Sequence, residues 1–147
     1  MQQTKTLLPF SFLLGCFLML PTWLLGQDFE EVQKVVASDR MTIGAEFGYK
    51  VDVSGSYAVV SVSADSQPFE KAIYVFERNE NDEWIEVKKF RPDDQILESD
   101  FGHDIAISGN IIVAGDRREP RDSNGNNPRE IAGAAYVYER NAQGEWQ

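Results

Sequence analysis

The sequence predicts an all-β fold built from two copies of a four-stranded antiparallel meander. The stretch FGYKVDVSGSYAVV, which begins at Phe47, recurs as FGHDIAISGNIIVA from Phe101. Short segments rich in Val, Ile, Tyr and Phe alternate with polar turns, and no long segment has a clean helical period. Repetition at this spacing is typical of folds in which one small unit stacks on its neighbour.

The first copy, residues 47–90, divides into four strands. YKVDV and YAVVSV flank a Ser-Gly turn, the compact connection expected of a hairpin, and AIYVFER and EWIEVKKF pair across the polar turn NEND. The second copy, residues 101–147, repeats the first hairpin and then reads AAYVYERNAQGEW where the first reads AIYVFERNENDEW. A four-stranded meander of about fifty residues has the size of one β-propeller blade.

A partial copy precedes the two units. FEEVQKV from Phe29 aligns with WIEVKKF from Trp84, so residues 29–36 are predicted to form an outer strand whose inner partners come from the far end of a complete ring. Closed propellers have about four to eight blades, and two blades leave edges and faces unpaired. We therefore expect an incomplete propeller, either the N-terminal piece of a longer protein or a truncated gene product.

Residues 1–26 have the order of a secretory signal peptide: a polar start with Lys5, a long apolar run, and Gly26 before the mature residues. A retained membrane anchor over residues 7–25 is an alternative, although Pro9 and Pro21 interrupt it. A third reading is a lipoprotein, because LLGC, ending at Cys16, resembles a lipobox. The apolar FLMLPTWLL that follows is unlike a polar tether.

Composition excludes several classes of function. Cys16 is the only cysteine, so cleavage near Gly26 leaves no thiol for a disulfide, thiol catalysis or a Cys-based zinc site. The formal net charge is -10, and loss of Lys5 makes it one unit more negative. Such a chain is expected to repel nucleic acid and anionic membrane surfaces. The charges are interspersed, which indicates a solvated, exported surface.

These repeats resemble the FG-GAP repeat of integrin α-chain-type β-propellers and of exported bacterial proteins. The resemblance rests on Phe-Gly, alternating apolar residues, a Ser-Gly turn and then GAAYVY from Gly133, and it covers nearly all of the mature chain. The first copy departs from the pattern, with Glu70-Lys71-Ala72 where Gly133 stands in the second. Phe47, Gly48, Phe101, Gly102 and Gly133 are the structural motif residues, with the phenylalanines expected between blades and Gly48 and Gly102 at close backbone approaches.

The resemblance implies a secreted or cell-surface binding or adhesion module that presents propeller loops to an extracellular protein or glycan. We expect no catalytic activity of its own, because no nucleophile elbow, zinc-binding His-Glu-x-x-His or phosphate-binding loop occurs. The alternative is an accessory propeller of a larger exported enzyme whose catalytic residues lie beyond Gln147. Further blades of the same polypeptide, or self-association, are the other partners expected.

Two features suggest specific chemistry. The loop DSNGNNPRE places Asp122, Asn124, Asn126 and Glu130 at positions 1, 3, 5 and 9 of a calcium-type loop, a spacing that integrin-type repeats also use. Two Asn replace carboxylates, and Pro128 stiffens the turn, so a polar surface loop is the alternative. His103 is the only histidine, but its counterpart is Tyr49, so packing or surface exposure is expected rather than catalysis.

Overall fold

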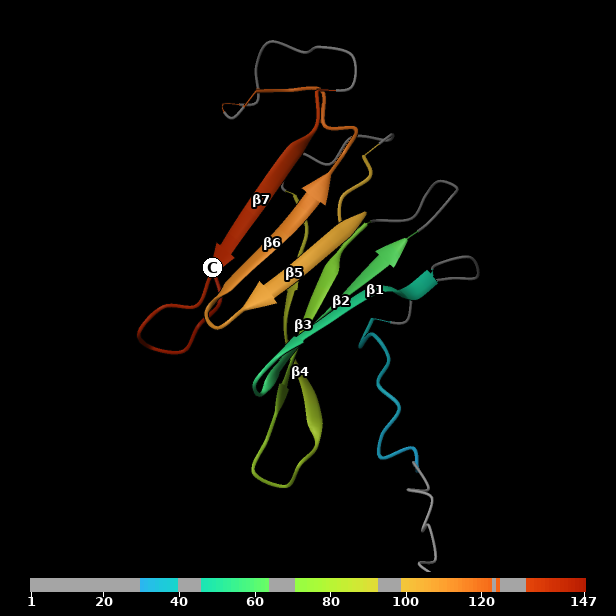
Figure 1. Cartoon of the computed structure of the whole chain (residues 1–147), viewed down its shortest axis with the longest axis vertical. Helices are drawn as coiled ribbons and strands as arrows, with labels where there is room; N and C mark the ends of the chain where they lie inside the picture. The colour runs from blue at the N-terminus through green and yellow to red at the C-terminus, as the bar shows by residue number, and fades with distance from the viewer. Residues whose placement is uncertain (1–29, 40–45, 64–70, 93–98, 123, 125–131) are drawn as a thin grey trace, which may run out of the picture. The chain divides into compact units, whose positions relative to one another are not determined.

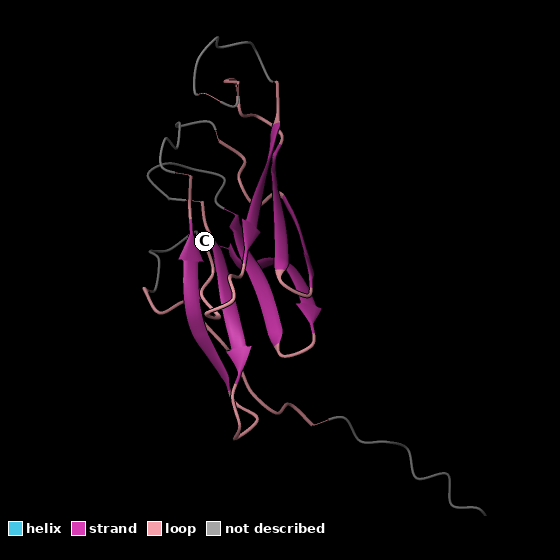
Figure 2. Cartoon of the chain, turned by 90° about the vertical axis from the view of Figure 1, so that its left-hand side faces the viewer, coloured by secondary structure: helices cyan, strands magenta, loops and turns pink. Residues whose placement is uncertain are grey.

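The computed structural model describes residues 30–39, 46–63, 71–92, 99–122, 124 and 132–147. These residues contain seven strands and no helix, and so no helix long and apolar enough to span a membrane (Figure 2). The strands are β1 (Glu46–Ser54), β2 (Tyr57–Ser63), β3 (Ile73–Arg78), β4 (Trp84–Phe90), β5 (Asp104–Ser108), β6 (Ile111–Asp116) and β7 (Ala134–Glu139).

The strands form two antiparallel meanders, β1-β2-β3-β4 and β5-β6-β7, each in chain order (Figure 1). The all-β prediction is confirmed, and two blade-like sheets that do not close into a ring constitute an incomplete propeller. We call the four-stranded sheet blade 1 and the three-stranded sheet blade 2. Blade 2 continues past β7 into a turn that returns along the strand, where Arg140 bridges Trp146.

Glycine and asparagine fix the turns of both blades in the same way. Gly55 and Gly109 close the first hairpins at φ 61° and 59°, a left-handed conformation that glycine adopts without steric cost. In the second turns, the side-chain oxygens of Asn79 and Asn141 accept backbone hydrogen bonds from residues two and four positions later. Local side-chain bonds of this kind specify a turn at the sequence level.

The main core lies between the two blades. Alternation along each strand directs Tyr57, Val59, Ile73 and Val75 to the face of blade 1 that meets blade 2. Blade 2 contributes Phe101, Ile107, Ile112, Ala114 and Trp146, which are also buried. The ring of Phe90 stacks on the ring of Tyr138 with centroids 3.8 Å apart. Burial of this apolar surface is the main force that holds the sheets together.

A second core lies on the opposite face of blade 1. Val60, Val62, Tyr74 and Phe76 are buried there, and residues 35–37 pack on them through Val35 and Ala37. Residues 30–36 of the predicted outer strand have no regular secondary structure, and Phe29 lies outside the described residues. Side chains tie this segment to β4 instead, with Gln33 bonding to the backbone of Trp84 and Ser38 to Glu86.

Candidate functional site: a pocket at the junction of the two sheets

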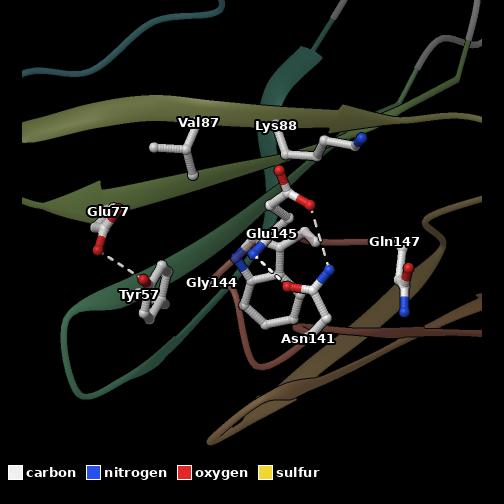
Figure 3. Close-up of a pocket in the computed structure, with 9 residues that line it drawn as sticks. Tyr57, Glu77, Val87, Lys88, Asn141, Gly144, Glu145 and Gln147 are labelled. Carbon is white, nitrogen blue, oxygen red and sulfur yellow. Dashed lines mark hydrogen bonds between the residues drawn. The ribbon is translucent and has the colours of Figure 1, made fainter.

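A pocket of about 560 Å³ opens between β4 of blade 1 and the terminal turn of blade 2 (Figure 3). Its volume is within the range of small-ligand sites. Blade 1 contributes Tyr57, Glu77, Val87 and Lys88, and the terminal turn contributes the remaining lining residues, which are Asn141, Gly144, Glu145, Trp146 and Gln147.

Local sequence shapes the wall that the terminal turn provides. The backbone N–H of Asn141 donates to the carbonyl of Glu145 at 2.9 Å, and Gly144 adopts φ 86° to let the chain reverse. The side-chain amide of Asn141 donates to the Glu145 carboxylate at 3.3 Å, a bond drawn in Figure 3. Asn141 and Glu145 thus present an amide and a carboxylate together at the rim.

Tyr57 anchors the inner end of the pocket. Its hydroxyl donates to the Glu77 carboxylate at 2.6 Å (Figure 3) and accepts from the Arg140 guanidinium at 2.6 Å. The guanidinium also lies over the Tyr57 ring, 4.4 Å from its centroid, in a cation–π contact. Trp146 meets the same ring edge-on, with centroids 5.6 Å apart. Arg140, from the second repeat, therefore joins the two blades at this point.

Burial keeps the Tyr57 hydroxyl of this anchor protonated. Burial raises the pKa of Tyr57 above its usual value, and the hydrogen bond to Glu77 raises it further, while Arg140 opposes the shift. The hydroxyl therefore stays a neutral donor at physiological pH. Two buried donors nearby, Nε of Arg140 and Nε1 of Trp146, have no hydrogen-bond partner among the described groups.

A second polar cluster centres on Asp100, just before Phe101. Lys71 donates to Oδ1 of its carboxylate at 2.8 Å, Arg117 donates to Oδ2, and His103 Nδ1 lies 3.8 Å from Oδ2. Burial alone raises the pKa of Asp100, but the hydrogen bonds and charges of Lys71 and Arg117 outweigh it and lower the pKa to about 2. Asp100 is therefore ionised at neutral pH and acts as a structural anion.

The neighbouring carboxylate, Asp116 at the end of β6, is almost fully buried and is held without a cation. The Ser99 hydroxyl donates to it at 2.6 Å, and the backbone N–H groups of Asp100 and Arg118 donate at 2.9 Å each. Three donors satisfy a buried carboxylate and fix the loops on both sides of it. A smaller cavity of about 260 Å³ lies beside this cluster, lined in part by His103 and Gly133.

Comparison with known families identifies the repeats. The sequence model described as FG-GAP repeat matches residues 29–76 and 84–138, which together are more than half of the chain. The chain belongs to the FG-GAP repeat family. Each match begins at a segment outside the three inner strands, which agrees with the alignment of the segment from Phe29 with β4. No curated protein and no solved structure matches the chain.

FG-GAP repeats form propeller-type modules that often occur in extracellular or adhesion proteins. The two Phe-Gly pairs that give the repeat its name occupy equivalent places here. Phe47 contacts Tyr74 and Phe76 edge-on, and Phe101 contacts their counterparts, Tyr136 and Tyr138, in the same way. Each phenylalanine thus packs on the aromatic pair of its own third strand.

The glycines of the motif differ in their surroundings. Gly48 and Gly102 have φ of 93° and 77°, a conformation that other residues rarely adopt. A Cβ on Gly102 would lie 3.1 Å from Ser61 Cβ and 3.2 Å from Ile73 Cγ2, both in blade 1, whereas a Cβ on Gly48 would meet nothing within 4 Å. Close approach is therefore a property of Gly102, at the blade interface, and backbone conformation accounts for Gly48.

The structure describes part of the predicted calcium loop. Asp122 and Asn124 are exposed, and the backbone N–H of Asn124 donates to the Asp122 carboxylate at 3.0 Å. Asn126 and Glu130 lie outside the described residues, so calcium binding by this loop stays a prediction. Within the residues that are described, no group of three His, Cys, Asp or Glu side chains is placed to hold a metal.

His103 lies at the interface between the blades. Its Nδ1 is 3.4 Å from the hydroxyl of Tyr49, its counterpart in the first repeat, and the two rings are tilted with centroids 6.0 Å apart. This contact joins β1 to the loop before β5. Sequence reasoning did not find the Tyr57 pocket or the Asp100 cluster, because their members come from segments far apart in the chain. The one available signal was the position of Arg140, which the repeat aligns with Arg78.

Proposed function

We propose that this chain is an exported binding module that uses its FG-GAP repeats to hold an extracellular protein or glycan. The carrying observation is the pocket between β4 and the terminal turn, which is lined by apolar and aromatic residues together with charged and amide groups. Export is supported by the signal-like order of residues 1–26 and by the frequent occurrence of the family outside cells.

The rim chemistry favours a ligand rich in hydroxyl groups. Lys88 supplies a cationic donor, Glu145 a carboxylate acceptor, and Asn141 and Gln147 supply amides, so both donors and acceptors line the pocket. Sugar hydroxyls both donate and accept, and such mixed partners satisfy them. Val87, on the wall, offers an apolar surface for the C–H face of a sugar ring. A glycan is therefore the first ligand class to test.

The proposal assigns no catalytic step to the described residues. A general acid or base needs a pKa near the working pH. The hydrogen bond from Arg121 lowers the pKa of Glu119, just as Lys71 and Arg117 lower that of Asp100. Both carboxylates are thus held ionised by neighbouring cations, as structural ion pairs are. These features support a binding role without chemistry of its own.

Glycan binding is tested with the chain as it is isolated from the host after export, with its N-terminus established by mass spectrometry. The protein is applied to a printed glycan array, and each positive glycan is titrated by calorimetry. We expect saturable binding that weakens at least about tenfold in Lys88→Ala, which corresponds to the loss of one charge-assisted hydrogen bond. Lys50→Ala is the matched control, because Lys50 pairs with Asp104 away from the pocket.

The results separate the possibilities. Equal weakening by both substitutions would show that net charge, and not the pocket, governs binding. An array with no positive glycan would exclude the glycan class and leave an extracellular protein ligand. A precursor that stays in the cytoplasm with residues 1–26 intact would remove export from the proposal.

The sequence pattern of the loop that begins at Asp122 leads us to propose that this loop binds calcium. We expect calorimetric heat of calcium binding and a raised melting temperature, both lost in Asp122→Ala, because a cation held by loop oxygens stabilises the folded state. Asp104→Ala, which removes an exposed carboxylate elsewhere, should leave the heat unchanged. A flat titration would show that the loop is a polar surface loop.

A further inference from the structure

Both outer faces of the two-blade unit expose apolar residues whose counterparts are buried or partly buried inside it. Val51 and Val53 of β1 are 65% and 58% exposed, and Val113 and Val137 on blade 2 are 37% and 65% exposed. Their counterparts in the other repeat all pack in the core between the blades, and these are Ile105, Ile107, Val59 and Val75. Each outer face therefore carries the equivalents of residues that form one side of the interface between blade 1 and blade 2.

In the described residues blade 2 has three strands, whereas blade 1 has four. On the outer side of β7, Glu139 exchanges two backbone hydrogen bonds with Gln147. In an antiparallel pair, alternate residues direct their backbone groups to the same side, so Val137 and Ala135 face outward with Glu139. Trp146 and Gln147 stand where Trp84 and Ile85 begin β4. An added strand beside β7 would continue from there, in the place that residues 86–90 occupy beside β3 in blade 1.

Residues 31–35 resemble the second half of β4, the fourth strand of blade 1, in sequence. They read EVQKV, and residues 86–90 of β4 read EVKKF. The segment also lies against blade 1 as β4 lies against blade 2. Val35 packs on the cluster that contains Phe76, and Phe90, its counterpart, stacks on Tyr138, the counterpart of Phe76.

A second pair of contacts repeats in the same way. Gln33 bonds to the backbone of Trp84, and Lys88, the counterpart of Gln33, lines a pocket with Trp146, the counterpart of Trp84. Residues 31–35 therefore already occupy the position of a fourth strand from a blade that precedes blade 1. Figure 1 shows that β7 (red) and the segment 31–39 (cyan) lie on opposite sides of the two sheets, so one copy does not join its own ends.

We propose that copies of this chain associate head to tail, with residues 31–35 of one copy forming the fourth strand beside β7 of the next. The pairing of Ile73 with Phe90 sets the register, which places Ala135 opposite Val35 of the other copy. In this arrangement Val113 and Val137 of one copy pack over Val51 and Val53 of the other. The segment keeps its present contacts, so association requires no refolding.

The new interface would repeat most of the existing one. At the existing interface, Ser54 Oγ accepts from the Gly109 N–H and Asp52 accepts from the Ile107 N–H. Ser108 repeats the role of Ser54, but Ala106 stands where Asp52 does, so one hydrogen bond is missing. Head-to-tail contacts close into rings or extend into filaments. Rings of about four to eight blades correspond to about two to four copies.

The first measurement is the mass of the isolated chain by light scattering over a range of concentrations. We expect concentration-dependent assembly beyond the monomer. Val137→Glu, which places a charge on the exposed face of blade 2, should shift assembly to at least about tenfold higher concentration. Val87→Glu puts the same charge on a comparably exposed valine outside both faces and should leave assembly unchanged. Circular dichroism checks that both variants are folded.

Cross-linking tests the register. In a Cys16→Ser background, a chain with Ala135→Cys is mixed with a chain with Val35→Cys and oxidised. Antiparallel partners have Cα atoms about 4.5–5.5 Å apart, within the range of a disulfide, so a mixed dimer should form. Lys34→Cys replaces Val35→Cys in the control, and its side chain points to the opposite face, so it should not cross-link.

Four results would overturn the proposal. One is a monomeric mass at every concentration. Another is equal cross-linking through Lys34→Cys and Val35→Cys, since neighbouring residues of an ordered strand point to opposite faces. The third is assembly that Val87→Glu disrupts and Val137→Glu does not. Assembly in which Val137→Cys alone links two copies efficiently would point to a face-to-face dimer of blade 2 instead, and would also exclude the strand addition.

Discussion

Replacement of Asp100 by asparagine should make the stability of the fold less dependent on acid. The Asp100 side chain is 13% exposed and is bound by Lys71 and Arg117. Its pKa is lowered from 3.8 to about 2. A shift of that size corresponds to about 2 kcal/mol of additional free energy of unfolding when the group is ionised. Asparagine keeps the shape of the side chain and removes the charge.

The sign of the effect follows from the direction of the shift. Because the folded pKa lies below the unfolded value, the contribution of Asp100 is present above about pH 4 and is lost as the pH falls through about 2. Asp100→Asn should therefore be about 2 kcal/mol less stable than the native chain at neutral pH. The difference should shrink toward zero near pH 2, where the native carboxylate is protonated as well.

Urea unfolding followed by tryptophan fluorescence, repeated from neutral pH to about pH 2, measures this difference. Other carboxylates, such as Asp39 and Glu119, also have lowered pKa values, but they are common to both proteins and cancel in the difference. Asp104→Asn is the control, because Asp104 is 81% exposed and its change should stay within about 0.5 kcal/mol. A difference between native chain and Asp100→Asn that does not vary with pH would refute the electrostatic account.

Four further substitutions test the packing between the blades by urea unfolding. Gly102→Ala should destabilise the chain more than Gly48→Ala. Both substitutions carry the cost of a positive φ, about 1–2 kcal/mol, but only the Cβ added at Gly102 would lie 3.1 Å from blade 1. Equal losses of stability in the two variants would show that this contact relaxes at no cost. Phe90→Ala should lower the free energy of unfolding by about 3–5 kcal/mol, since it removes a buried ring stacked on Tyr138. A decrease below about 1 kcal/mol would mean that this contact does not hold the sheets together. Tyr57→Phe keeps the ring and removes the hydroxyl that joins Glu77 to Arg140, so about 1–3 kcal/mol should be lost, whereas an unchanged midpoint would show that water replaces the hydroxyl.

The strands could be predicted because their signals are local. Alternation of apolar residues fixes which side chains enter the core, and Ser-Gly turns fix the hairpins. The structure places strands over nearly all the segments expected in the two copies. The segment 31–37 is not a strand, because no described strand pairs with it. No local sequence signal reports whether that partner is present.

The candidate site could not be predicted because its members are joined only by the fold. Tyr57 and Arg140 are 83 residues apart and meet at 2.6 Å, and Lys71 and Asp100 are 29 residues apart and meet at 2.8 Å. Which loops come together depends on how one blade packs on the next, and a repeat pattern does not specify that rotation. The sequence therefore predicted the strands and their turns better than it predicted which polar groups meet.

The pocket arises where the second repeat departs from the first. Arg78 and Arg140 occupy the same repeat position, but Arg78 bonds to Asp82 in its own turn. Gly144 stands where Asp82 does, with the same left-handed backbone, so Arg140 lacks the carboxylate acceptor that Arg78 has in its own turn. Its guanidinium instead crosses the junction to the Tyr57 hydroxyl. Substitution of Gly144 by aspartate thus offers Arg140 a local partner, at the cost of the contact that joins the two blades beside the pocket.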